Sequence, residues 1–133
     1  MSAVAETADR SSYLRRVLWV DAATCLAMGV LLVIAAAPLS EFLGLPARLL
    51  SYAGVALFPV ALFMGWVALR ESLSVGGAWV VILGNAGWVA GSVAALLVFS
   101  PTAIGYAFVL VQAVAVALLA ELEYVGLRRA ENS

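Results

Sequence analysis

Four polar side chains interrupt the long apolar stretches of this chain, and they are the residues whose types could do chemistry. Asp21 lies about one turn into the first stretch, Asn85 lies in the third, and Gln112 and Glu123 lie in the fourth. An ionisable or amide side chain within a membrane segment is costly to bury and is a functional-site candidate by default. We therefore take Asp21, Asn85, Gln112 and Glu123 as the candidate intramembrane site residues.

Asp21 has no arginine three or four residues away along its own helix, so its partner must come from another helix. A structural ion pair with Arg70 or Arg128, near the membrane surface, is one interpretation, and we favour it. The other interpretation is a proton- or cation-coupling group, because a carboxyl group can exchange its charge within the membrane.

Asn85 and Gln112 are the two amides that the sequence places deep in the apolar stretches. Ser92 shares a helix face with Asn85, and antiparallel packing of the two helices would set Gln112 between Asn85 and Ser92. Hydrogen bonds of this kind between membrane helices stabilise by roughly 0.6–2 kcal/mol. Structural cross-links are the favoured interpretation, and a polar lining for a substrate or proton path is the alternative.

Glu123 shares a face with Gln112, about three helical turns away, whereas Glu121 points about 200° from Glu123. The two glutamates therefore do not form a catalytic carboxylate pair with each other. For Glu123 we expect either a partner among the arginines or contact with water; the candidate partners are Arg15, Arg16 and Arg70.

The composition excludes several kinds of site. The seven cationic residues are all arginine, there is no histidine, and Cys25 is the single cysteine. These counts remove a lysine Schiff base, the commonest metal and haem ligand, and any disulfide within one chain. The net charge of −1 offers no basic surface for nucleic acid. We predict no cofactor, no metal, no catalytic residues and no enzymatic activity.

The element that positions Asn85 and Gln112 is a run without a charged side chain, from Ser72 to Ala120. As one helix it would reach roughly 73 Å, whereas the hydrocarbon core of a bilayer is about 30 Å thick. The run must fold back, and Ser100-Pro101-Thr102 is the turn-like spot near its middle. It therefore predicts two membrane-spanning helices joined by a tight hairpin.

The whole pattern predicts an all-α membrane protein, an up-down bundle of four transmembrane helices within a single domain over residues 11–129. The short outer loop is expected at Leu39–Leu45, after Pro38 ends the first helix, and Gly126 is expected to end the last helix. Pro59 should kink the second helix. The predicted spans are 14–37, 47–69, 78–99 and 102–125, with a loop over 72–77, a loose polar tail over 1–10 and a C-terminal tail over 130–133.

Small residues recur on the third predicted helix, where Gly84, Gly87, Gly91 and Ala95 form a stripe. Such stripes let helix backbones approach closely. We expect this one to pack against another helix of the same chain, in preference to a dimer seam.

The arginines predict the orientation. If the N-terminus is cytoplasmic, that side holds every arginine except Arg48. The positive-inside rule therefore places both termini in the cytoplasm of a multi-pass protein of the bacterial inner (plasma) membrane.

The chain resembles uncharacterised small bacterial four-helix membrane proteins, and its size and layout are similar to those of DoxX-like proteins. The resemblance rests on Arg-Arg-x-Leu-x-x-Asp at Arg15–Asp21, Asn-x-x-Trp at Asn85–Trp88 and Glu-x-Glu-Tyr-x-Gly-Leu-Arg-Arg at Glu121–Arg129. It implies no known activity, so it assigns no site residue.

Two functions fit these observations. We expect a non-enzymatic accessory or interaction component, whose partners are the lipid bilayer and either further copies of the chain or another membrane protein. The alternative is an oligomeric small-solute transporter or channel that uses Asp21, Asn85 and Gln112. A water-filled groove reaching Asn85 and Gln112 would favour transport, whereas dry and closed packing would favour the accessory role.

Overall fold

The computed structural model describes residues 2–70 and 74–131, with side chains placed for 12–70 and 74–130. The described residues form helices and no strands. In chain order the helices are α1 (Ser2–Ile34), α2 (Ala36–Leu43), α3 (Ala47–Leu69), α4 (Val75–Phe99) and α5 (Ala103–Glu131). Four of them, α1, α3, α4 and α5, are long and apolar enough to cross a membrane. The prediction of an all-α, four-span up-down bundle is confirmed, and the chain is a small integral membrane protein.

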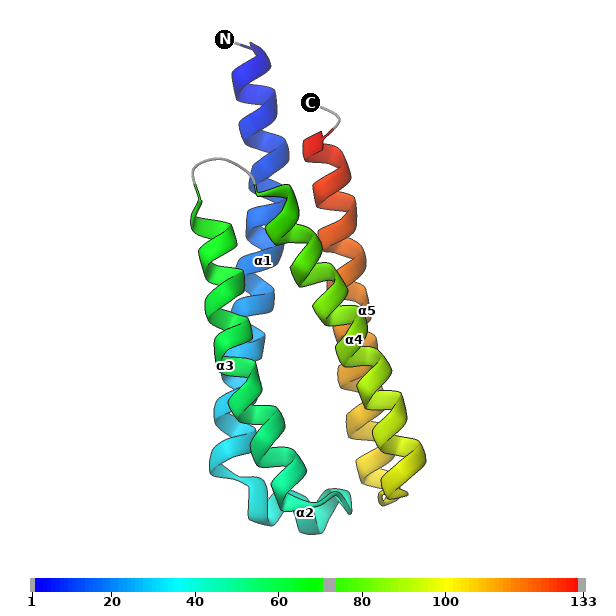
Figure 1. Cartoon of the computed structure of the whole chain (residues 1–133). Coiled ribbons are helices and arrows are strands. Elements are labelled where there is room, and N and C mark those ends of the chain that lie inside the picture. The colour runs from blue at the N-terminus through cyan, green and yellow to red at the C-terminus, as the bar shows by residue number, and fades with distance from the viewer. Residues whose placement is uncertain (1, 71–73, 132–133) are drawn as a thin grey trace.

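The long helices run alternately up and down, so both termini lie at one end of the bundle (Figure 1). We call this the proximal end. The opposite, distal end carries α2 and the turn between α4 and α5 (Figure 1). Large apolar side chains such as Leu26, Leu62 and Leu97 are exposed along the outer faces of the helices, as contact with lipid requires.

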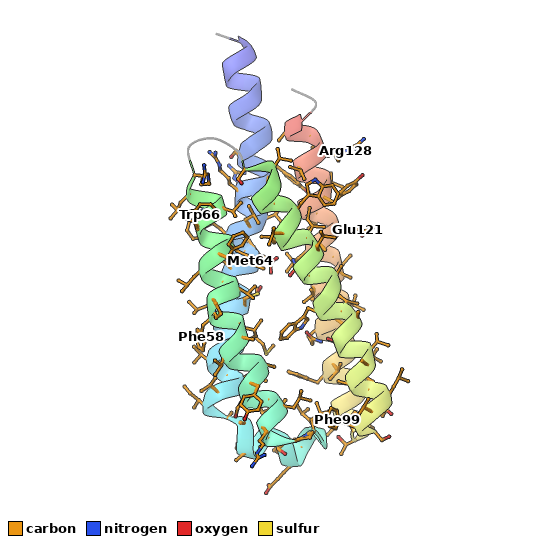
Figure 2. All side chains as sticks on the ribbon, viewed as in Figure 1. Phe58, Met64, Trp66, Phe99, Glu121 and Arg128 are labelled. Atoms are coloured by element: carbon orange, nitrogen blue, oxygen red, sulfur yellow. The ribbon has the colours of Figure 1, made fainter. Side chains whose placement is uncertain are left out.

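Aromatic rings and arginines gather at the proximal end, where Figure 2 labels Trp66 and Arg128. The guanidinium carbon of Arg70 lies 4.8 Å from the centre of the Trp66 ring, and that of Arg129 lies 4.9 Å from the centre of the Tyr13 ring. Tryptophan, tyrosine and arginine are typical of the membrane–water interface. The proximal end therefore has the composition of an interface.

The helix boundaries differ from the sequence prediction mainly at the ends. The span predicted over 47–69 matches α3, and α3 continues through Pro59 without a break. The segment predicted as a loose tail is the first part of α1, which begins at Ser2. The last helix passes the predicted stop at Gly126 and reaches Glu131. Residues 75–77 of the predicted 72–77 loop belong to α4, and residues 130–131 of the predicted C-terminal tail belong to α5. Of these two segments, residues 72–73 and 132–133 lie outside the described residues.

The predicted outer loop at Leu39–Leu45 is wrong, because most of it is the short helix α2. The chain bends at Ala35, and Pro38 falls in the first turn of α2, where a helix lacks a partner for the N–H group that proline does not have. Proline thus begins a new helix here as well as ending the old one. Gly44 ends α2 in the left-handed conformation, with a φ of 69°, and its N–H donates to the carbonyl of Ser40.

Glycines join α1 to α3. A Cβ atom added to Gly54 of α3 would lie 2.9 Å from the Cβ of Leu32 and 3.0 Å from the backbone oxygen of Gly29, both in α1. These helices therefore pack backbone against backbone, as small residues allow in membranes. Gly126 makes a similar approach between α5 and α1, where an added Cβ would lie 3.1 Å from the Cα of Leu14.

The predicted packing of the α4 stripe is wrong. A Cβ added at Gly84, Gly87 or Gly91 would meet nothing within 4 Å. The reason is that α3 and α4 hardly pack together: they approach at the proximal end and diverge toward the distal end (Figure 1). The small residues of α4 face open space between these two helices.

A hydrogen-bonded clasp holds the distal end together. Thr102, just before α5, donates its backbone N–H to the carbonyl of Leu43 over 3.0 Å and its hydroxyl to the carbonyl of Phe42 over 2.8 Å. The same hydroxyl accepts from the N–H of Gly105. The C-terminal end of α2, whose carbonyls have no helical partner, is in this way attached to the start of α5.

Candidate functional site

Asp21, Asn85 and Glu123 form one buried cluster, which we call the polar centre. The side-chain nitrogen of Asn85 donates to Asp21 Oδ2 and to Glu123 Oε1, each over 2.8 Å. The three side chains come from α1, α4 and α5, and their exposed fractions are 1%, 5% and 0%. Because both carboxyl oxygens contact the same nitrogen, the two carboxyl groups are close neighbours.

The local sequence explains how these helices present the cluster. Asp21 lies between Leu18 and Ala22, which belong to the apolar core at the proximal end, and it is buried with them. Glu123 precedes Leu127 by one turn, and Leu127 is fully buried in the same core. The apolar positions that fix each helix face therefore also direct the carboxyl groups inward.

Two further atoms complete the surroundings of the polar centre. The thiol of Cys25, one turn after Asp21, lies 3.6 Å from Asp21 Oδ1 and donates to it. Glu123 Oε2 is buried and has no hydrogen-bond partner in the described part of the chain. A buried carboxyl oxygen without a donor is costly unless it binds a proton, water or a ligand.

The predicted arginine partners are wrong for both carboxyl groups. Asp21 contacts Asn85 and Cys25, not Arg70 or Arg128. Glu123 is fully buried, so it does not extend into bulk water as the alternative prediction had it. Its hydrogen bond comes from Asn85 and not from its expected partners, Arg15, Arg16 and Arg70. One arginine of that group, Arg15, instead donates to the backbone carbonyl of Arg70 over 2.7 Å.

Gln112 belongs to a second network, one to two turns further along α4. Trp88 donates its indole N–H to Gln112 Oε1 over 2.8 Å, and Gln112 donates to Ser92 Oγ over 2.9 Å. The predicted contact of Gln112 with Ser92 is confirmed, but the contact with Asn85 is not, because Asn85 uses its amide for the carboxyl groups. Gln112 thus orients Trp88, and does not join the polar centre.

Two cavities lie along these networks. The proximal chamber, of about 310 Å³, is lined by residues that include Cys25, Phe63, Gly84, Asn85 and Trp88. The distal chamber, of about 410 Å³, is lined by residues that include Met28, Leu49, Trp88, Gly91, Ser92 and Gln112. Trp88 lines both chambers and is the one lining residue that the two have in common. Each volume lies in the range of small-molecule binding sites.

The chambers connect the candidate residues in a way that the sequence did not indicate. Asn85 borders the proximal chamber and Gln112 borders the distal one, while Asp21 and Glu123 stand behind Asn85. The sequence analysis did not select Trp88 as a site residue, because a tryptophan in a helix bundle more often fills the space between helices than binds a ligand. The spacing of Asn85, Trp88 and Ser92 at three and four residues was the available signal, because it places them on one face of α4.

Within the described residues, no group of three or more cysteine or acidic side chains is arranged to hold a metal ion. Comparisons with protein-family models, with curated proteins and with solved structures found no match. The resemblance to small bacterial four-helix proteins therefore stays a prediction, and the function must be argued from the site itself.

Proposed function

We propose that this chain is a non-enzymatic membrane carrier, in which the polar centre holds an exchangeable proton and couples its movement to that of a small solute. The observation that carries the proposal is the buried pair Asp21 and Glu123, bridged by Asn85 at the edge of a cavity. Of the two functions that the sequence left open, this is the transport alternative.

A shared proton follows from electrostatics. Two ionised carboxylates this close in a medium of low dielectric repel each other strongly, and one proton between them removes the repulsion. The titratable side chains that face one another here are Asp21 and Cys25 of α1 and Glu123 of α5. From α4 comes the neutral Asn85, and the residues that α3 contributes to the chamber are apolar or sulfur-containing and do not titrate.

The cavities favour the carrier over the accessory component. A partner-binding role was expected to accompany dry and closed packing, whereas the chambers reach both Asn85 and Gln112. Large apolar side chains are exposed on all four spans, as lipid contact alone requires, and no described feature of these faces distinguishes a protein partner.

Infrared difference spectroscopy in a lipid bilayer tests the shared proton. After a pH step, we expect the C=O stretch of a protonated carboxyl group to appear or disappear in the wild-type protein and to be lost or shifted in Glu123→Gln. Glu121→Gln is the matched control, because Glu121 is exposed on the same helix two residues away. If no carboxyl band responds to pH in the folded wild-type protein, the proposal fails.

Proteoliposomes test the coupling. With a pH gradient and an entrapped pH dye, we expect at least one solute from a panel of quaternary ammonium, arylphosphonium and neutral aromatic compounds to drive proton exit. The wild-type protein and Glu121→Gln should respond alike, and Glu123→Gln should not. A panel without any response that depends on Glu123 would leave the protein without a coupled solute and would favour the accessory role.

For orientation we propose that both termini face the cytoplasm, supported by the arginine-rich proximal end. Reporter fusions at the C-terminus and next to Arg48 should report opposite compartments. Matching compartments would contradict the up-down arrangement in the membrane.

A further inference from the structure

We propose that the solute is a lipid-soluble organic cation that enters sideways from the bilayer, between α3 and α4, and occupies the chambers on either side of Trp88. This inference rests on the proposed function, since it names the class of solute that exchanges with the proton.

The entry is the gap between α3 and α4. Gly84 borders the proximal chamber and Gly91 borders the distal one, and a Cβ at either position would meet open space. Both glycines are exposed, as is Val60 of α3, which also lines the proximal chamber. A solute dissolved in the hydrocarbon can therefore reach the chambers without crossing a polar surface. Because glycine has no side chain, nothing on this face of α4 blocks the way.

The walls select an apolar body. Met28, Leu49 and Phe108 line the distal chamber, and Phe63 and Met64 line the proximal one. Apart from Asn85, Ser92, Gln112 and the indole N–H of Trp88, the lining residues offer aliphatic, aromatic or sulfur-containing surfaces. Such a site binds a large apolar solute better than a hydrated inorganic ion, which would lose its water without replacement.

The charge of the site selects a cation. Asp21 and Glu123 have no arginine partner among the described residues, and Glu123 Oε2 is fully buried without a hydrogen bond. The face of the Trp88 ring also attracts positive charge. An anion of the same size and shape would lie near the two carboxyl groups behind Asn85, and it would find no cationic side chain among the lining residues of either chamber.

The exchange balances in charge. When the cation occupies the proximal chamber, its positive charge replaces that of the proton shared by the carboxyl pair, and the proton leaves to water. No covalent bond other than the O–H bond of the carboxyl group breaks. Binding of the cation should therefore release a proton and weaken as the pH falls.

Binding of two probes with the same shape and opposite charge tests the inference. We expect tetraphenylphosphonium to bind saturably to the protein in bilayer nanodiscs and to release protons, and tetraphenylborate not to bind saturably. Equal binding of both ions would overturn the selection for a cation. Saturable binding of neither, with the carboxyl band still responding to pH, would overturn this inference and leave the proposed proton exchange intact.

Glycine variants test the entry. We expect Gly91→Leu to fill the distal chamber and weaken tetraphenylphosphonium binding at least tenfold. Gly76→Leu is the matched control, since Gly76 is a bare, exposed glycine of the same helix outside both chambers. Unchanged affinity in a folded Gly91→Leu protein would overturn the lateral site.

The single cysteine provides a readout that does not depend on transport. Cys25 lines the proximal chamber, so bound tetraphenylphosphonium should slow the modification of its thiol by N-ethylmaleimide. The Cys25→Ser protein has no thiol and measures the background of the assay. We expect this protection in the wild-type and Gly76→Leu proteins and its loss in Gly91→Leu. Trp88→Leu should also lose it, whereas Trp88→Phe, which keeps an aromatic face, should retain most of it. Equal protection in all four variants would place the probe elsewhere and overturn the inference.

Discussion

The two sides of α3 use glycine in opposite ways. Toward α1, Gly54 and Gly29 bring two backbones into contact; a side chain at Gly54 would collide with α1, and one at Gly29 would be tightly packed against α3. Toward α4, the facing glycines touch nothing, and the space beyond them belongs to the chambers. The comparison teaches that a small residue in a membrane helix can mark either of two features. One is a seam, where two helix backbones touch, as between α1 and α3, and the other is an opening, where the helices stand apart, as between α3 and α4. The position of the neighbouring helix decides between them.

The largest expected effect comes from adding a side chain at the seam between α1 and α3. Gly54→Leu would force its side chain into Leu32 and Val33 of α1, whose atoms lie 2.9 Å from a Cβ at this position. Overpacking typically costs about 1–3 kcal/mol, and a whole leucine at a backbone contact belongs at or beyond the upper limit. We expect a large loss of thermal stability or failure to fold. Gly91→Leu, its counterpart at the opening, should leave the melting temperature in detergent nearly unchanged.

If Gly91→Leu destabilises the protein as much as Gly54→Leu does, α3 and α4 pack together in the membrane and the opening does not exist. That result would restore the expectation drawn from the glycine stripe alone.

The next largest effect concerns the polar centre. It joins α4 to α1 and α5 toward the proximal end, where α3 and α4 approach each other. Asn85→Leu removes the donor shared by Asp21 and Glu123 and leaves two buried carboxyl groups facing each other. Loss of hydrogen bonds to charged groups costs about 1.5–3 kcal/mol each, so we expect a loss of about 3 kcal/mol in the free energy of unfolding. Unfolding in a denaturing detergent measures it.

A double-mutant cycle sharpens this prediction. In Glu123→Gln, the repulsion between the carboxyl groups is relieved, so the added cost of Asp21→Asn should differ from its cost in the wild-type protein. Cycles of Asp21 with Arg70 or Arg128 should be additive, because neither arginine contacts Asp21 among the described residues. Strong coupling to an arginine would show that the polar centre is not the partner of Asp21.

A smaller effect is expected at the distal clasp. Thr102→Val keeps the shape of the side chain but removes the hydroxyl that joins α2 to the start of α5. Losing a helix cap of this kind costs about 1 kcal/mol. Because the clasp holds the distal ends together, the variant should also increase the rate at which N-ethylmaleimide modifies Cys25. An unchanged rate would mean that the clasp does not limit the opening.

The smallest effect is expected for Gln112→Leu. It removes the hydrogen bonds to Trp88 and Ser92, which connect α4 with α5, two helices that already pack along their length. Such bonds contribute about 0.6 kcal/mol on average in membranes. Thermal unfolding should change little, while Trp88 loses the contact that orients its ring. If Gln112→Leu lowers the free energy of unfolding as much as Asn85→Leu does, the second network, and not the polar centre, is the main link to α4.

Much of the fold could be predicted because hydrocarbon imposes simple limits. The charge-free run before Glu121 had to form two spans, and the predicted range 47–69 coincides with α3. The polar centre could not be predicted in the same way. Which faces of α1, α4 and α5 meet depends on the rotation and tilt of each helix, and apolar surfaces on every side of α4 leave that rotation undetermined in the sequence.

The errors share this cause. The sequence places the amides of Asn85 and Gln112 at similar depths on antiparallel helices, which suggested that they would meet. In the structure Asn85 binds the two carboxyl groups, whereas Gln112 binds Trp88 and Ser92. The glycine stripe of α4 failed for the same reason, because spacing identifies a face but not the helix opposite it. Likewise Pro38 indicated that the first helix ends nearby, but the break lies at Ala35 and Pro38 itself belongs to the short helix α2.

The polar centre also constrains the order in which the protein is made. Its members come from the first, third and fourth spans, and synthesis from the N-terminus delivers Asp21 to the membrane long before Asn85 and Glu123. Until α4 arrives, the carboxyl group of α1 must stay near the water interface or keep a proton, because hydrocarbon offers it no donor. We therefore expect the first span to settle at its final depth only when the last helix is inserted, so that the final quarter of the chain completes the placement of the first.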